Sequence, residues 1–303
     1  MPKKRDIEKD CMTTSTQQNT LQFDVNKAGI VTLWLDSGER PVVILDRELI
    51  QRLNFALDAI DRLDKVNGLI LRSSCERVFV AGADLAEIDR LDDPGLHSYL
   101  AFGTTVFGRI SSMDCPTVAC INGATLGGGL ELAMHCDILI ASKTTKSGKP
   151  YPIGLPEAGL GLCPGWGGSQ MLPARIDPVT AIKATASGTP FMISDLPDGL
   201  VYSFVETPDD LQSAAESIIQ NISSHSKTPR AITTSESEKY STALEIAKAE
   251  IESTEAAEGV FLAVTIGIQK GWSAAVAIEQ CELVRLRNTH VAREKLDAFL
   301  SKG

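Results

Sequence analysis

The sequence lacks the features that several common protein classes require. Acidic residues outnumber basic ones, with 39 Asp and Glu against 29 Lys and Arg, which gives a formal net charge of -10. A surface that tracks nucleic-acid phosphates needs a basic patch or stripe, so this balance argues against RNA or DNA as a partner. No apolar run approaches membrane-spanning length, and the basic residues near the start precede a polar run instead of a signal-peptide core. We therefore expect neither a nucleic-acid nor a membrane partner.

The cysteines do not have the spacing of a metal or redox site. Seven of them are scattered along the chain without a CxxC pair. An odd, dispersed set of this kind is typical of reduced thiols in the cytoplasm. We therefore predict structural cysteines, no metal site and a cytoplasmic location.

Nucleotide-binding fingerprints are also missing. No G-x-G-x-x-G motif occurs. Gly123 and Gly128 have the spacing of a phosphate-binding loop, but Gly129 and Leu130 stand where that loop requires Lys and Ser or Thr. The glycines of this chain therefore serve another purpose.

The pattern of strands and helices predicts an α/β protein. Strand-like runs flank the turn at 26–29, which predicts a hairpin. Apolar residues at helical spacing predict a helix over 47–63, and the run at 68–74 then predicts a buried strand. A second helix over 94–113 leads to another apolar strand at 116–121. Repeated strand-then-helix order indicates an α/β architecture.

The composition divides the chain into three parts. Residues 1–20 are polar and rich in Thr and Gln, which predicts a flexible tail. Residues 21–207 hold the predicted strands and form the core. From 208 to 303 the chain becomes rich in Ala, Glu, Ser and Lys, which predicts a helical C-terminal region.

The segment PTVACINGATLGGGLELAMHCD, residues 116–137, carries the strongest chemical signal. A strand runs into three consecutive glycines and then a predicted helix, whose first backbone N–H groups can approach a ligand closely. Such a turn can stabilise a developing negative charge, although a tight packing turn has the same sequence. Glu131 falls in the first turn of this helix, where the helix dipole favours a carboxylate for structural or catalytic reasons alike.

A second glutamate stands in GLPEAGLGLCPGWGGSQMLP, residues 154–173. Glu157 has apolar neighbours, so its carboxylate must be solvated, paired or used, because desolvation raises its pKa. A glutamate that points to water is the alternative. When two carboxyls lie in different environments, their pKa values differ, so that one can act as a base and the other as an acid.

A third segment, RVFVAGADLAEI at 77–88, joins a short strand to a predicted helix. Its Gly82 and Ala83 N–H groups can supply a second donor to a developing oxyanion, with Asp84 as the N-cap of the helix. An ordinary capped turn is the alternative.

Together and in this order, the three segments resemble the enoyl-CoA hydratase/isomerase (crotonase) superfamily, from about Leu21 to the C-terminus. The resemblance implies a spiral of repeated ββα units, followed by a helical region that packs between subunits in trimers or dimers of trimers. It implies an acyl-CoA substrate and no cofactor, because coenzyme A is part of the substrate.

The resemblance also assigns roles to individual positions. It implies that the Ala83 and Gly128 N–H groups form an oxyanion hole and that Glu131 and Glu157 are catalytic. Gly165 is expected to orient the water. The residues expected to contact coenzyme A are Ala81, Gly82, Ala83, Asp84, Leu85, Phe299 and Lys302.

Three functions remain open on this basis. Because both glutamates are present, a hydratase that adds water to a 2-enoyl-CoA comes first, with Glu131 as base and Glu157 as acid. A 3-enoyl to 2-enoyl-CoA isomerase comes second, and a non-catalytic binding protein on the same fold third. His135 is expected to pack in the core.

The segment 143–152 looks like an insertion between the two glutamates. Loops of this kind are often functional. Its lysines, Lys143, Lys146 and Lys149, are candidates for attracting the CoA phosphates, and a solvated turn is the alternative.

Overall fold

The computed structural model describes residues 20–222 and 230–301, so the predicted tail lies outside it except for Thr20. The strands are β1 Phe23–Val25, β2 Ile30–Leu35, β3 Gly68–Ser73, β4 Val78–Val80, β5 Thr117–Ile121, β6 Ala124–Leu126, β7 Ile138–Ser142, β8 Pro152–Gly154, β9 Phe191–Met192 and β10 Ser203–Val205. The α-helices are α1 Arg47–Ile60, α2 Leu85–Arg90, α3 Asp93–Ser111, α4 Gly128–Met134, α5 Gly168–Met171, α6 Pro178–Ser187, α7 Leu211–Asn221, α8 Ser237–Glu250, α9 Glu255–Lys270, α10 Trp272–Arg287 and α11 His290–Leu300. Short 3-10 helices are η1 Glu157–Leu160, η2 Ile193–Asp195, η3 Pro208–Asp210 and η4 Thr234–Glu236.

The described strands form two sheets. One is six-stranded, in the order β1-β2-β3-β5-β7-β10, and the other is four-stranded, in the order β4-β6-β8-β9. The chain alternates between them, because β3, β5 and β7 lie in the larger sheet and the strand after each lies in the smaller one. A helical segment, α2, α4 or η1, follows each such pair. The prediction of an α/β fold with repeated ββα units is therefore confirmed.

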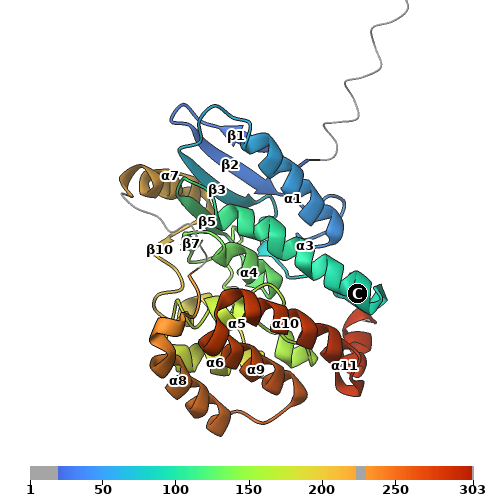
Figure 1. Ribbon diagram of the computed structural model, residues 1–303. Helices are drawn as coiled ribbons and strands as arrows, with labels where there is room; N and C mark the ends of the chain where they lie inside the picture. Colours follow the sequence, from blue (N-terminus) through green and yellow to red (C-terminus); the bar gives the residue numbers. More distant parts are fainter. Residues whose placement is uncertain (1–19, 223–229, 302–303) are drawn as a thin grey trace, which may run out of the picture.

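The larger sheet is covered on both faces, which explains its continuous apolar strands. Every residue of β5 and β7 is buried. On one face the sheet packs against α1, whose buried Leu53 and Leu57 follow the predicted helical spacing from the N-cap Asp46. On the other face α7 contributes Leu211 and Ile219 (Figure 1).

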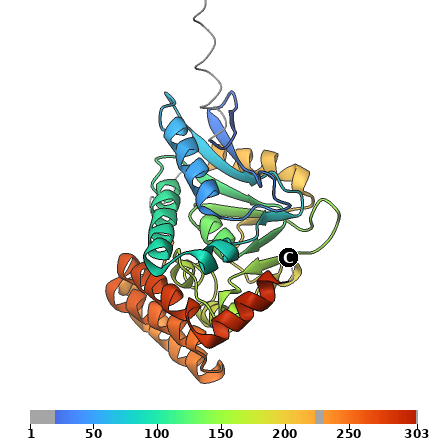
Figure 2. The same cartoon turned by 90° about the vertical axis from the view of Figure 1, so that its right-hand side faces the viewer.

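The helices α8 to α11 gather at one end of the molecule, away from α7 (Figures 1 and 2). There α10 packs on α9 and on α3, and α9 packs on α5 and α6. The predicted region 208–303 therefore contains α7, which packs on the larger sheet, and four helices at the other end of the molecule. Of these four, α9 and α10 pack on α5, and α11 packs on η1, which begins at Glu157. The domain boundary near 207 stays a prediction.

Two further observations concern membranes and thiols. Within the described ranges, no helix is both long and apolar enough to cross a bilayer.

The described cysteines are free, and four of them are buried: Cys115, Cys120, Cys136 and Cys163. Burial raises the pKa of Cys120 to about 12, so this thiol is protonated and unreactive at neutral pH.

Candidate active site

The turn between β6 and α4 requires glycine for two reasons. Gly127, the N-cap of α4, has φ 52°, a left-handed conformation that side chains rarely adopt. A Cβ on Gly127 would lie 2.8 Å from Oε1 of Glu157, and a Cβ on Gly128 would lie 2.3 Å from the ring of Trp166. The turn is therefore enclosed by a carboxylate on one side and an indole on the other.

The segments with the two predicted oxyanion donors lie side by side. Because β4 pairs with β6 in parallel, with Val80 opposite Thr125, the chain that follows each strand enters the same place. A Cβ on Gly82 would lie 3.2 Å from the carbonyl oxygen of Leu126. Gly82 and Ala83 thus approach the turn that begins α4.

Both predicted donors are free in the described part of the chain. Ala83 forms a parallel bridge with Leu45, in which Leu45 N–H donates to Gly82 O and Asp84 N–H donates to Leu45 O. This pattern directs the N–H of Ala83 to the opposite side. Gly128 is the first residue of α4, and no hydrogen bond among the described residues uses its N–H or that of Ala83. Their joint role as an oxyanion hole stays a prediction.

Glu131 is buried on α4, and two backbone donors of the described chain hold its side chain. Its residue is 1 % exposed. One oxygen, Oε1, accepts hydrogen bonds of 2.8 Å from the N–H groups of Trp166 and Gly168. Burial, together with the nearby Glu279 and Glu157, raises its pKa well above the ordinary value, and the two N–H groups partly oppose that rise.

Glu157 begins η1 and faces the same turn. Its Oε1 lies beside Gly127, and its Oε2 is buried and has no hydrogen-bond partner among the described residues. Burial raises the pKa of Glu157 to about 8, so this carboxyl holds a proton at neutral pH. Glu131 and Glu157, separated by 26 positions in the sequence, therefore meet at the first turn of α4.

A further glutamate, which is buried, was missed from the sequence. Glu279 on α10 is 0 % exposed and accepts hydrogen bonds from Gly167 N–H at 2.6 Å and from Ser169 N–H at 2.9 Å. Burial raises its pKa to about 7. Its position could have been found, since Val276, Glu279 and Leu283 share the helical spacing of a buried face.

Of the other predicted residues, some lie beside Glu131 or cap α2, one is exposed on α11 and one lies outside the described residues. Gly165 directly precedes Trp166, whose N–H binds Glu131, and Asp84 caps α2 through the N–H groups of Ala86 and Glu87. Phe299, near the end of α11, is 54 % exposed, and Lys302 lies outside the described residues.

His135 lies in the core, as expected. Its Nδ1 is 2.8 Å from the hydroxyl of Ser111, and its ring contacts Phe107 edge to face. Burial lowers the pKa of His135 to about 4, so the imidazole is neutral at physiological pH. Its surroundings are those of a packing residue.

The segment 143–152 contains an exposed turn at 146–150, whereas Thr145 and Tyr151 are buried. Lys143 pairs with Glu206 at 2.5 Å, and Lys146 pairs with Glu76 at 2.7 Å. Both lysine side chains are 56 % exposed. These pairs fit the solvated-turn alternative, and the attraction of CoA phosphates by these lysines stays a prediction.

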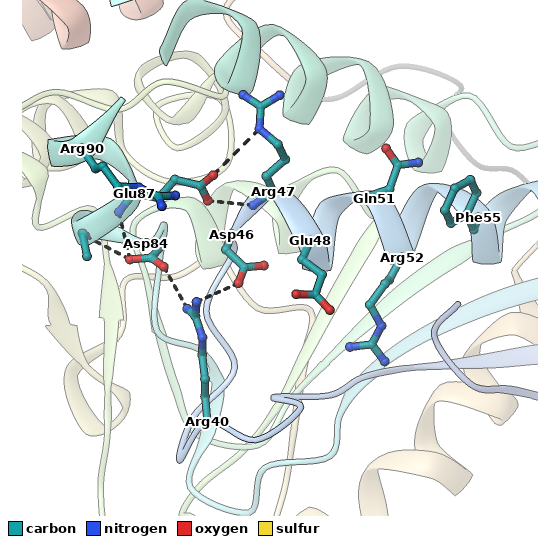
Figure 3. Close-up of a pocket in the computed structure, with 11 residues that line it drawn as sticks. Arg40, Asp46, Arg47, Glu48, Gln51, Arg52, Phe55, Asp84, Glu87 and Arg90 are labelled. Atoms are coloured by element: carbon teal, nitrogen blue, oxygen red, sulfur yellow. Dashed lines mark hydrogen bonds and ion pairs between the residues drawn. The ribbon is translucent and has the colours of Figure 1, made fainter. Parts of the chain in front are cut away.

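A surface cavity of about 770 Å³ lies between α1 and α2, next to the segment with Ala83 (Figure 3). Four arginines and four acids line it, so the lining is neutral overall. They are Arg40, Arg47, Arg52 and Arg90 with Asp46, Glu48, Asp84 and Glu87. The sequence reading did not identify these arginines, because they are scattered over 51 positions and no motif marks them.

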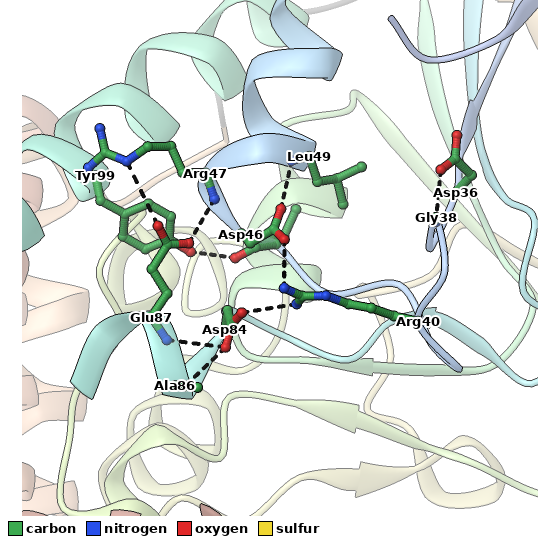
Figure 4. A network of polar contacts seen from close by, with 11 residues as sticks. Asp36, Gly38, Arg40, Asp46, Arg47, Leu49, Asp84, Ala86, Glu87 and Tyr99 are labelled. Carbon is green, nitrogen blue, oxygen red and sulfur yellow. Dashed lines mark hydrogen bonds and ion pairs between the residues drawn. The ribbon is translucent and has the colours of Figure 1, made fainter. Parts of the chain in front are cut away.

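Ion pairs organise this cavity. Arg40 bridges Asp46 and Asp84, each at 2.9 Å, and Arg47 lies against Glu87 (Figure 4). Among the described residues Arg90 has no ion-pair partner, which leaves it as the cation most available to an anionic ligand.

Comparison with known proteins identifies relatives of this chain and of its fold. The model of the family described as Enoyl-CoA hydratase/isomerase matches residues 26–266. The short-chain-enoyl-CoA hydratase of Clostridium acetobutylicum is 32% identical over 210 residues, which is 68% of this chain and 76% of that protein.

Solved structures share the fold at lower identity. An enoyl-CoA hydratase from Rhodobacter sphaeroides 2.4.1 has a TM-score of 0.70 and 20% identity, with 93% of this chain and 89% of that chain covered. The human mitochondrial delta3-delta2-enoyl-CoA isomerase has a TM-score of 0.67 and 21% identity, with 93% and 97% covered. At these levels of sequence identity, the structural similarity shows a shared fold and no more.

Proposed function

The chain belongs to the enoyl-CoA hydratase/isomerase family, and we propose that it is a hydratase that adds water to the double bond of a 2-enoyl-CoA thioester. The observation that carries this proposal is the difference between its two facing carboxyls. Glu131 has one oxygen fixed by two N–H groups, whereas Glu157 has a buried oxygen without a partner. The first arrangement stabilises an anion, and the second favours a protonated acid.

In the proposed reaction the thioester oxygen lies between the N–H groups of Ala83 and Gly128. Glu131 removes a proton from water, and the oxygen of that water bonds to C3 of the substrate. The electron pair of the double bond moves toward C2 and the thioester oxygen, where the two N–H groups stabilise the charge. Each such donor contributes a factor of roughly 10²–10³ in rate.

The addition is completed by Glu157. Its proton passes to C2, which leaves the 3-hydroxyacyl-CoA product, a protonated Glu131 and an ionised Glu157. Gly165 is proposed to orient the water, since its neighbour Trp166 holds Glu131. This acid–base chemistry requires no metal or redox cofactor.

The cavity between α1 and α2 is the proposed site of the CoA nucleotide. It adjoins Asp84, within the segment Ala81 to Leu85 that is expected to contact coenzyme A. Arg90 and the paired arginines supply the cations that phosphates prefer. Phe299 and Lys302 stay proposed contacts of the adenine and phosphate, from the same or a neighbouring subunit.

A short acyl chain is the proposed substrate class. Trp166 is 1 % exposed and fills the space between Gly103 of α3 and Gly128 of α4, beside the reacting pair. The relative from Clostridium acetobutylicum is a short-chain enzyme by name. We expect crotonyl-CoA to be hydrated with a higher kcat/KM than a long 2-enoyl-CoA.

Double-bond isomerisation is the second candidate. Burial raises the pKa of Glu157 to about 8, and its Oε2 has no hydrogen-bond partner among the described residues, which suits a single group that, once ionised, removes a proton from C2 and returns it to C4. A binding role without catalysis is the third candidate.

One set of assays separates these functions. Hydration lowers the ultraviolet absorbance of crotonyl-CoA because conjugation is lost, whereas isomerisation raises the absorbance of a 3-enoyl-CoA because conjugation is gained. We expect the first signal to dominate. Turnover of the 3-enoyl-CoA alone would establish the isomerase, and turnover of neither would favour a binding protein.

A further inference from the structure

The loop Gly165 to Ser169 lies between two buried glutamates. The N–H groups of Trp166 and Gly168 both donate to Oε1 of Glu131, at 2.8 Å. The N–H groups of the alternate residues, Gly167 and Ser169, donate to Glu279, at 2.6 and 2.9 Å. Successive backbone donors thus point alternately to a carboxylate of α4 and to a carboxylate of α10.

The carboxylate of Glu279 accepts more hydrogen bonds than that of Glu131. The hydroxyl of Ser169 also donates to Glu279, at 2.5 Å, and accepts from Nε2 of Gln170, at 2.7 Å. Both oxygens of Glu279 therefore accept hydrogen bonds, whereas within residues 20–222 and 230–301 only Oε1 of Glu131 does. The loop is fixed on α10 and leaves the other oxygen of Glu131 free for a reacting molecule.

Few charged groups face Glu279. Glu131 of α4, Glu157 of η1 and the thiol of Cys163 lie across the loop, and Glu282 follows one turn later on α10. The helices α3 and α9 bring uncharged groups to this place, with Leu100 against Gly165 and the Ala263 carbonyl against Gln170. The charge on Glu279 therefore acts on the other carboxyls without a compensating cation in this cluster.

We propose that Glu279 is a positioning residue for Glu131: it holds the Gly165 to Ser169 loop in register, so that the N–H groups of Trp166 and Gly168 keep their bonds to the Glu131 carboxylate. The inference rests on the proposed role of Glu131 as a base. It links the C-terminal helix α10 directly to the reaction, through a residue that does not contact the substrate.

Loss of Glu279 would affect the site through backbone donors. The N–H groups of Gly167 and Ser169 would remain buried without acceptors, which is unfavourable enough for the loop to shift. Movement of the loop would displace the two N–H groups that hold Glu131. It would also move the indole of Trp166 away from Gly128, whose N–H is a proposed oxyanion donor.

The first experiment compares pH profiles of kcat/KM on crotonyl-CoA for the wild type, Glu279→Gln and Glu279→Asp. Removing the charge in Glu279→Gln makes Glu131 easier to ionise, so the acid limb should move to lower pH by about one unit. Glu279→Asp keeps the charge but is shorter, so the limb should stay in place while kcat falls about 10–100-fold. Glu282→Gln, on the same helix but without a bond to the loop, should match the wild type.

If the role of Glu279 is structural alone, the expected pH profiles are different. Both variants would then lose activity or stability without any movement of the acid limb, and that result would overturn the proposal. If Glu279→Gln does not fold, Ser169→Ala replaces it. Loss of the hydroxyl donor keeps Glu279 neutral up to a higher pH, so the acid limb should again move to lower pH; an unmoved limb would again overturn the proposal.

A second experiment does not depend on activity. Urea unfolding midpoints are measured for Glu131→Gln, Glu279→Gln and the double variant. Because both side chains hold the same loop, the effect of the double variant should differ from the sum of the single effects. Additive effects would contradict the proposal, whereas an inactive wild type would count only against the proposed function.

Discussion

The three glutamates of this cluster, two buried and one partly buried, differ in the number of hydrogen-bond donors they have. Within the described part of the chain, Glu279 has three donors, Glu131 has two and the buried Oε2 of Glu157 has none. No cation of the described chain offsets the charge of these carboxyls and burial raises their pKa values, so this cluster holds fewer than three negative charges at neutral pH. We assign the proton first to Glu157, because nothing stabilises an anion on its buried oxygen.

This assignment predicts how stability depends on pH. The pKa of Glu157 is raised from 4.5 to about 8 on folding, so between these values the folded state keeps a proton that the unfolded state releases. The contribution of this group to stability therefore falls as pH rises from about 5 to 8. Relative to the wild type, Glu157→Gln should gain on the order of 3 kcal/mol in unfolding free energy over this window.

Urea unfolding at a series of pH values measures this difference. Glu238→Gln, which removes an exposed carboxyl of α8, serves as the control and should show a constant offset. A Glu157→Gln offset that is equally constant would show that Glu157 ionises normally in the folded protein.

The packing of Trp166 leads to a second prediction at the residue scale. Its indole donates to Leu100 O at 2.9 Å and contacts Tyr99 and Phe107 edge to face. Trp166→Ala should therefore lower the unfolding free energy by about 3–5 kcal/mol, as for other large buried aromatics. Tyr202→Ala, at a side chain that is 70 % exposed, should change it by less than about 0.5 kcal/mol. Equal, small effects would mean that the indole is not packed as described.

Sequence reasoning located some of these residues and missed others. Glu131 and Glu157 were identified because each stands in a glycine-bearing or apolar segment that makes a carboxylate unusual. Glu279 stands among Ala, Glu and Gln in a helix, where a glutamate is ordinary, and only its burial distinguishes it. The same holds for the arginines of the α1–α2 cavity, which come together only through the fold.

At the scale of elements, α10 connects two parts of the candidate site. Its Glu279 holds the Gly165 to Ser169 loop, and its Arg287 reaches α2. Arg287 is 2 % exposed and donates to the carbonyl oxygens of Ile88, at 2.8 Å, and Leu91, and to the carboxylate of Asp93. The C-terminal helices therefore fix α2, next to the proposed oxyanion donor Ala83.

We predict that Arg287→Met weakens the protein by about 2–3 kcal/mol in unfolding free energy, because it leaves buried carbonyl oxygens without donors. Thermal or urea unfolding measures the change. Arg285→Met on the same helix removes ion pairs of an exposed guanidinium with Glu255 and with the partly buried Glu282, so its effect should be below about 1 kcal/mol. Comparable losses in the two variants would contradict this role of Arg287.

The elements were largely predictable, whereas their arrangement was not. Periodicity and turn residues gave the hairpin β1–β2, the helices α1 and α3 and the strands β3 and β5. The division of strands between two sheets depends on pairing between distant segments, which local patterns do not encode. That part of the fold was predicted through the family resemblance, carried by three glycine-bearing segments.

At the scale of the whole molecule, the helical end presents apolar side chains to solvent. Leu262 of α9, Ile246 of α8 and Phe299 of α11 are between 40% and 54% exposed. The predicted trimer or dimer of trimers would give these side chains a partner. Light scattering should yield three or six times the chain mass of 32.5 kDa. A mass of one chain at working concentration would contradict the prediction.

The central claim is that Glu131 and Glu157 together hydrate an enoyl thioester, and the loss of crotonyl-CoA absorbance tests it most directly. We expect the wild type and Glu282→Gln to be equally active, and Glu131→Gln and Glu157→Gln each to lose at least about 10²–10⁴ in kcat. Folding of each variant is checked by circular dichroism. Hydration that survives at a near wild-type rate in either folded variant would contradict the two-carboxylate account.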